Sequence, residues 1–297
     1  MTPDEYAEIV NRLADTHRGR IADVLQRLEE RIAAIAGSAP VRQGVLFDLA
    51  YALQARNQIR GALTDEYLVA VQQLIEEYPS LYASQYEMFS ELGDFIRVEP
   101  EIISALQRQS FQGFEAIAEQ QLDVLANGVY RSTLVGESRD VLIKDLRGSI
   151  NGIYQASDQE EIRRLVAVAQ NATGQAREDA IRTLHNRYAA DRLGNNMRRY
   201  ATTYAEDSLS QFSASITART AEEMGIETFE YYGDLITDSR KFCRDIINET
   251  DHKNEYTKEE IERIWDKESW AGKAPGNPFI VRGGYNCRHH WLPLVEV

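Results

Sequence analysis

The side chains best suited to chemistry lie near the C-terminal end of the sequence. Two short segments contain or enclose both cysteines, three of the five histidines and all three tryptophans of the chain. The first segment is 238–243, Asp-Ser-Arg-Lys-Phe-Cys, and the second is 283–291, Gly-Gly-Tyr-Asn-Cys-Arg-His-His-Trp. Either a small module that closes a long body or a functional site would explain this distribution.

The sulfur and imidazole donors of this region are candidate metal ligands. In chain order they are Cys243, His252, Cys287, His289 and His290. Zinc takes four such ligands in a tetrahedron, and an ion would help a module that is too small to be stable through its core alone. The spacing contains no Cys-x-x-Cys pair, however, and 287–290 would need a tight turn to supply several ligands.

Two other interpretations of the cysteines stay open. Cys243 and Cys287 would form a disulfide if their segments pack side by side, although a cytoplasmic origin disfavours this bond during assembly. They would otherwise be buried thiols that pack as small apolar side chains, with His289 or His290 bonded to a carbonyl.

A catalytic site built on these cysteines and histidines would need a further group. A cysteine nucleophile with a histidine base requires a third group that orients the base. Asp238, Asp245 and Asp251 are candidates, and the sequence does not choose among them. The chain shows no glycine-rich phosphate loop, serine nucleophile elbow or paired His-Glu metalloprotease motif. We therefore expect no catalysis and, apart from zinc, no cofactor.

Length and composition describe an ordinary folded protein with an acidic surface. The 297 residues amount to about two average domains. With 43% apolar and 27% charged residues, the chain is neither disordered nor fibrous. Because no apolar run approaches about 18 residues, we expect no membrane span. The acidic start, residues 1–6, lacks the layout of a signal peptide, which predicts synthesis in the cytoplasm.

The negative charge is concentrated before the chemistry-bearing segments. Residues 1–237 carry 23 Lys and Arg against 36 Asp and Glu, whereas 238–297 carry 10 against 11. A surface this acidic repels the phosphate backbone, so direct or sequence-specific nucleic-acid binding by the body is not expected.

The hydrophobic pattern predicts a mainly α protein with a small C-terminal α+β module. We expect about eight or nine helices in an acidic helical domain, residues 1–226, and the module at 227–297. Helices are predicted at about 3–36, 41–63, 64–78, 80–92, 100–125 and 191–224, with further ones near 141–150, 157–172 and 181–188. In the module we predict strands at 228–233, 279–281 and 291–295, helices at 239–247 and 258–267, and a Gly283-Gly284 turn that joins the last two strands.

Three short motifs occur in a fixed order in the second half of the chain. A helix ends in 216–223, Ile-Thr-Ala-Arg-Thr-Ala-Glu-Glu, and Gly225 and an aromatic strand at 229–232 follow. Asp238-Ser239-Arg240 precedes Cys243, and the chain closes on 284–288, Gly-Tyr-Asn-Cys-Arg. This order resembles the minor head, or head-morphogenesis, proteins of tailed bacteriophages, the Mu F-like family.

The resemblance covers about residues 128–292 and implies a structural motif. Its residues here are Asp238, Arg240, Gly283, Gly284, Arg288 and Trp291. Members often carry a second cysteine soon after the first and end on Cys-Arg-Cys. This chain has isoleucines after Cys243, and His289 replaces the last cysteine, which keeps a metal ligand at that position.

The resemblance implies a virion protein, made in the host cytoplasm and docked near the portal vertex. It would act in head assembly, DNA packaging or ejection, in several symmetric copies that contact the portal and other head or neck proteins. A second hypothesis is a toxin- or hydrolase-like C-terminal module that uses His252, His289 or His290. A third is a metal-stabilised module that binds another protein.

Overall fold

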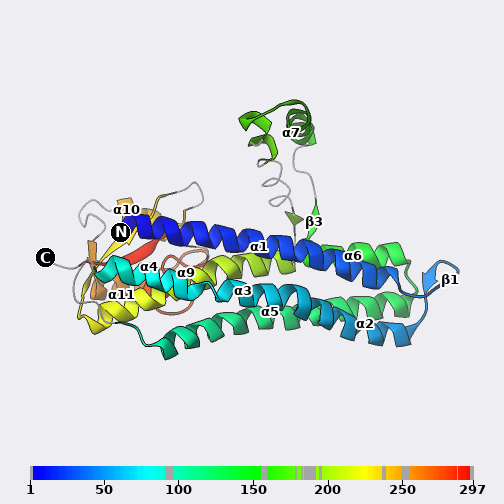
Figure 1. The fold of residues 1–297 in the computed structure, drawn as a ribbon, viewed down its shortest axis with the longest axis horizontal. Coiled ribbons are helices and arrows are strands. Elements are labelled where there is room, and N and C mark those ends of the chain that lie inside the picture. Colours follow the sequence, from blue (N-terminus) through cyan, green and yellow to red (C-terminus); the bar gives the residue numbers. More distant parts are fainter. Residues whose placement is uncertain are drawn as a thin grey trace. The chain divides into compact units, whose positions relative to one another are not determined.

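The computed structural model describes residues 3–90, 97–154, 159–177, 179–181, 183, 192–193, 196–235, 239–248, 255–285 and 287–294. Its fold is mainly α, with small strands and short helices in a C-terminal α+β module, which confirms the predicted class (Figure 1). The chain forms two compact units that each combine segments distant in sequence. The first unit is 1–22, 68–116 and 201–297, and the second is 23–67 and 117–200. Residue 226, the predicted boundary, lies inside the first unit, because the module packs with helical segments.

The second unit is built from helices, with one short β-hairpin and a second antiparallel strand pair whose strands are far apart in sequence. It contains the end of α1 (Pro3–Gly37), β1 (Val41–Arg42), β2 (Val45–Leu46), α2 (Leu49–Ala62), η1 (Leu63–Leu68), the later part of α5 (Pro100–Val135), α6 (Arg139–Asn151), β3 (Ile153–Tyr154), α7 (Gln159–Asn171) and β4 (Arg192–Leu193). The hairpin is β1–β2, and the second pair is β3–β4. Arg31 binds Asp65 and Glu66 of η1, at 2.8 and 3.2 Å. Buried Asn151 donates to the carbonyl of Leu25, at 3.2 Å, and so joins α6 to α1.

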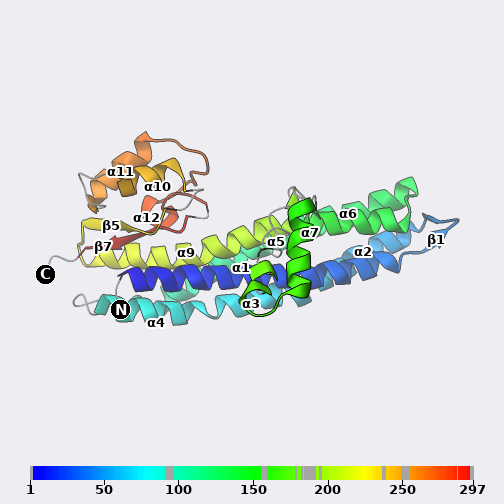
Figure 2. The same cartoon turned by 90° about the horizontal axis from the view of Figure 1, so that it is seen from above.

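The first unit contains the start of α1, α3 (Val69–Ile75), α4 (Tyr78–Ser90), the start of α5, α9 (Met197–Glu223) and the module. Helices α4 and α9 lie beside the start of α1 (Figures 1 and 2). Hydroxyl groups on α9 are buried in this contact. Tyr6 bonds Ser213 at 2.7 Å, and Tyr78 bonds Ser208 at 3.0 Å.

The module is organised around strand β5 (Thr228–Tyr232). Glu222 and Ala221 accept hydrogen bonds from Gly225 and Ile226, so a Schellman turn ends α9 just before the strand. β5 pairs antiparallel with β6 (Glu255–Thr257) on one edge and with β7 (His290–Pro293) on the other. Figure 2 shows β5 and β7 beside α9, with α10 (Lys241–Asn248) and α11 (Lys258–Lys267) on their other side.

Every second side chain of β5 is buried in the module core. Phe229 and Tyr231 point inward, as the period of two in a strand requires. They pack with aromatic side chains of α10, α11 and β7, including Phe242, Trp265 and Trp291. The sequence therefore changes from helix-forming to β-forming residues near residue 228 because the packing changes there from helices to a half-buried sheet.

The prediction of a helix over 41–63 is wrong at its start, because residues 41–46 form the β1–β2 hairpin. Gln43 and Gly44 have φ of 52° and 83°, so they form the two-residue turn of the β1–β2 hairpin. α2 begins only after Asp48, whose side chain accepts from the amide groups of Ala50 and Tyr51.

Four predicted helix boundaries are also wrong. The helix predicted from about 191 begins only at Met197, because Arg192 and Leu193 form strand β4. Helix continues from α2 through the π-helical turn η1 into α3, so 64–66 starts no new helix. Pro79 lies in the first turn of α4 instead of ending a helix, because a proline needs no hydrogen-bonded amide there. α5 runs through Gly128 to Val135, because packing outweighs the weak helix propensity of a single glycine.

The predicted strand at 279–281 is a short helix, α12 (Pro278–Val281). Asn277 caps it by accepting from the amide of Phe279, and Pro278 occupies its first turn. Gly283 and Gly284 consequently join a helix to the segment before β7, and β7 pairs with β5 instead. Within the described residues, no helix combines the length and the apolar character that a membrane span requires.

Candidate functional site: a buried Cys-Cys-His cluster

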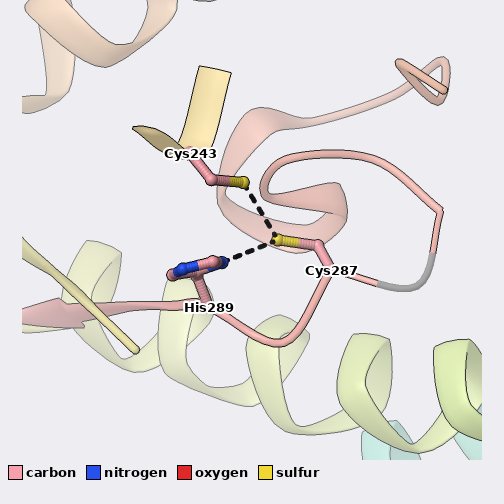
Figure 3. A group of neighbouring side chains, drawn as sticks. All are labelled: Cys243, Cys287 and His289. Atoms are coloured by element: carbon pink, nitrogen blue, oxygen red, sulfur yellow. Dashed lines mark hydrogen bonds between the residues drawn. The ribbon is translucent and has the colours of Figure 1, made fainter. Parts of the chain in front are cut away.

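The fold brings together the two chemistry-bearing segments. Cys243 lies on α10, and Cys287 and His289 lie on the segment that leads into β7 (Figure 3). The Sγ atoms of Cys243 and Cys287 are 3.8 Å apart, and Sγ of Cys287 is 3.6 Å from Nδ1 of His289. One donor atom from each of the three residues lies within 4.8 Å of the other two. All three side chains are buried.

Tyr231 and Gly283 complete the wall around the sulfur atoms. The Tyr231 hydroxyl lies 3.5 Å from Sγ of Cys243 and 3.4 Å from Sγ of Cys287. The Tyr231 ring stacks on His289, with ring centroids 5.1 Å apart. A Cβ at Gly283 would lie only 2.5 Å from Sγ of Cys243 and 3.0 Å from Sγ of Cys287, so no larger residue fits without movement.

The two thiols titrate as a pair. Their mutual hydrogen bond lowers the pKa of Cys287 well below its usual value and raises the pKa of Cys243. One proton shared by two sulfur atoms stabilises the first thiolate, and the remaining charge resists loss of the second proton. Burial, followed by the charge on Cys287, raises the pKa of Tyr231.

A second set of buried polar groups surrounds His290 on β7. Burial and then the charge of Arg282 lower the pKa of His290 to about 3, so this imidazole is neutral in the folded protein. Arg282 is only 1% exposed and has a φ of 54°, in the left-handed region. Within the described part of the chain, Nε and Nη1 of Arg282 and Nε2 of both His289 and His290 have no hydrogen-bond partner.

The described residues of the predicted structural motif hold segments of the module together. Arg240 donates to the carbonyl of Tyr285 and lies against Gly272, where a Cβ would meet its Nε at 2.7 Å. Gly284 has a φ of 106° and contacts the backbone of Gly272 so closely that a Cβ would lie 2.0 Å from its carbonyl oxygen. Trp291 packs on Tyr231, with ring centroids 4.3 Å apart.

Arg288 differs from the other motif residues because it reaches the helices of the first unit. Its Nη2 lies 2.7 Å from Oδ1 of Asp15 on α1 and 3.6 Å from Oε1 of Glu206 on α9. Asn11 of α1 donates to the Arg288 carbonyl, at 3.3 Å. This arginine therefore links the closing segment of the module to two helices.

Of the five predicted metal ligands, the structure brings Cys243, Cys287 and His289 into one group. His290 lies next to His289 on the chain but is not a member of that group. His252 and the motif residue Asp238 lie outside the described residues.

Sequence reasoning missed Tyr231 and Arg282. Alternation along the aromatic strand could have shown that Tyr231 faces the core with Phe229. Burial of Arg282 has no comparable signal in the sequence, since arginine is among the residues least often buried.

The hollows on the first unit differ in size and in chemistry. The cavity that adjoins Cys287 has a volume of about 10 Å³, roughly the space of one water molecule. A larger one, about 320 Å³, is lined by α10, β6 and α11 and combines aromatic, aliphatic and charged side chains. Neither cysteine lines the larger hollow.

Comparisons with family models, with curated proteins and with solved structures find nothing that matches this chain.

Proposed function

We propose that the chain is a structural virion protein of a tailed bacteriophage, a portal-associated minor head protein that acts in head assembly, DNA packaging or ejection. The proposal extends the motif resemblance described above. It places the protein in several symmetric copies at the portal vertex, in contact with the portal and other head or neck proteins.

The proposal rests on one observation: the motif residues connect segments of the chain that are separate in sequence. Arg240 and Gly284 hold the 272–285 region together, and Gly283 provides space for the two sulfur atoms. Arg288 joins the module to α1 and α9. Residues that connect backbone segments in this way fix the shape of a module, which is what an assembly protein presents to its neighbours.

The surroundings of the cysteines also support a structural role. Their sulfur atoms are buried, and the adjoining cavity has room for about one water molecule. A site that binds a substrate of ordinary size is a much larger concave pocket with a few converging polar groups. The acidic charge of residues 1–237 suits a position near packaged DNA without adhesion to it.

The test is incorporation into particles. The full chain is produced with the portal and major capsid proteins of the same phage genome, and the heads are purified and imaged by electron cryomicroscopy. We expect the chain in the particle fraction and density with the symmetry of the portal at one vertex. A chain that remains a free monomer while complete heads form would refute the proposal.

A pair of arginine variants makes the test specific to the module. Arg288→Ala removes the link from the module to Asp15, whereas Arg18→Ala removes another partner of Glu206 from α1 without touching the module. We expect reduced incorporation of the first variant and normal incorporation of the second. Because both arginines are about half exposed, neither change should cost more than about 1 kcal/mol of folding free energy.

Replacing His289 and His290 by Ala tests the catalytic hypothesis, which complete particles that have lost an enzymatic activity of the unmodified particles would support.

A further inference from the structure

We propose that Cys243, Cys287 and His289 bind a zinc ion that holds the C-terminal module closed. The inference stands apart from the assembly role, because it depends only on the arrangement of these side chains. It would be valid for a module of any function.

Two distances in the cluster equal the edges of a zinc tetrahedron. With bonds of about 2.3 Å to sulfur and about 2.05 Å to nitrogen, tetrahedral angles separate two sulfur ligands by about 3.8 Å and sulfur from nitrogen by about 3.6 Å. The Sγ atoms of Cys243 and Cys287 are 3.8 Å apart, and Cys287 Sγ is 3.6 Å from His289 Nδ1. Both pairs therefore already have the spacing that a shared ion imposes.

The third edge is close to the same geometry. Cys243 and His289 offer donor atoms within 4.8 Å of each other, so closing this edge to about 3.6 Å requires a movement of about 1.2 Å at most. The three donor atoms therefore lie close to the arrangement of zinc ligands.

The Tyr231 hydroxyl meets two of the conditions for a fourth ligand. A zinc-bound oxygen about 2.0 Å from the ion lies about 3.5 Å from each sulfur ligand. The hydroxyl oxygen is 3.5 Å from Cys243 Sγ and 3.4 Å from Cys287 Sγ. Its distances to both sulfur atoms therefore match those of a fourth ligand.

The donors are held by separate parts of the module. Cys243 comes from α10, whereas Cys287 and His289 precede β7, and Gly283 approaches both sulfur atoms from the turn after α12. An ion at this point would link α10 to the edge of the sheet. Such a link adds binding free energy to folding, which benefits a small module most.

A disulfide does not account for this geometry. The sulfur atoms lie 3.8 Å apart, whereas a disulfide bond is about 2.05 Å long. A disulfide would also not explain why Nδ1 of His289 lies 3.6 Å from Sγ of Cys287. Thiolate and imidazole donors together suit zinc, which binds both and keeps them in tetrahedral geometry.

The first experiment uses the unmodified full chain, purified without a polyhistidine tag or chelator. Elemental analysis should find about one zinc per chain. Replacement of zinc by Co²⁺ should give the visible absorption of a tetrahedral cobalt site and the near-ultraviolet band of thiolate-to-cobalt charge transfer. Both thiols should react with a thiol reagent after chelation and be protected when Zn²⁺ is restored.

The adjacent histidines supply a matched pair of variants. His289 and His290 are buried to nearly the same degree, at 4% and 3% exposure, so truncation of either leaves a similar void. Loss of a residue that only hydrogen-bonds to a metal ligand weakens metal binding by roughly 10- to 100-fold. His289→Ala removes a ligand itself, so it should weaken zinc binding by more than this. His290→Ala should weaken zinc binding by less than about tenfold. Cys243→Ser should reduce the thiolate-to-cobalt band to about half, the intensity that one remaining sulfur ligand gives.

Several outcomes would overturn the proposal. These are metal-free protein that binds neither Zn²⁺ nor Co²⁺, equal losses in the two histidine variants, and thiols that zinc does not protect. Denatured protein without free thiols would show a disulfide instead. The cobalt spectrum and the thiol protection use the unmodified chain, so they decide the question even if a variant fails to fold.

Discussion

Gly283→Ala tests whether the module closes by packing the two cysteine segments against one turn. The new Cβ would lie 2.5 Å from Cys243 Sγ and 3.0 Å from Cys287 Sγ. Favourable contacts of this kind begin near about 3.5–4.0 Å, so the nearer sulfur must move by about 1 Å. Overpacking of a buried site typically costs about 1–3 kcal/mol, and we expect a loss of this size in the free energy of unfolding.

Gly19→Ala is the matched control. Gly19 lies inside α1, in the same unit, and a Cβ there meets nothing within 4 Å. Because alanine favours helix over glycine, this change should stabilise the protein by about 0.5–1 kcal/mol. The two glycine variants should therefore differ by roughly 1.5–4 kcal/mol, with opposite signs relative to the unmodified chain.

The assay is urea unfolding followed by tryptophan fluorescence, in reducing buffer with a chelator. All three tryptophans, Trp265, Trp270 and Trp291, belong to the module, so the signal reports its unfolding directly. Repeating Gly283→Ala in a Cys243→Ala background removes the nearest sulfur and should reduce the cost by about 1 kcal/mol. A Gly283→Ala variant as stable as Gly19→Ala, or a cost unchanged without the Cys243 sulfur, would refute the packing argument.

Two further changes test other parts of the first unit. Thr257→Ala should lower the unfolding free energy by about 1 kcal/mol, because Thr257 and Glu260 form a capping box at the start of α11. The same fluorescence assay measures it, and an unchanged urea midpoint would contradict the role of the cap. Burial lowers the pKa of His17 despite its contact with Glu77, so the unfolded chain protonates first and stability should fall as pH drops below about 6.5. His17→Gln should flatten this dependence in urea titrations between neutral and acid pH, and parallel curves for both proteins would count against it.

The sequence by itself determined the type of most elements and the place of the module. Periodic apolar residues predicted α1, and Thr257 as a cap predicted the start of α11, because both signals involve residues only a few positions apart. The β-forming residues at 228–232 likewise identified β5. Local chemistry was misjudged at Gln43-Gly44 and at Asn277-Pro278, where a turn and a cap replaced the expected helix and strand.

Only the tertiary structure decided what the chemistry-bearing residues contact. Cys243 and Cys287 are distant in sequence, and their 3.8 Å separation results from the pairing of β5 with β7 and the packing of α10 on that sheet. The same packing selected His289 over His290, because neighbouring residues on an extended segment point in opposite directions. Composition and spacing supply candidate donors, but their convergence depends on contacts between distant segments, which local patterns do not encode.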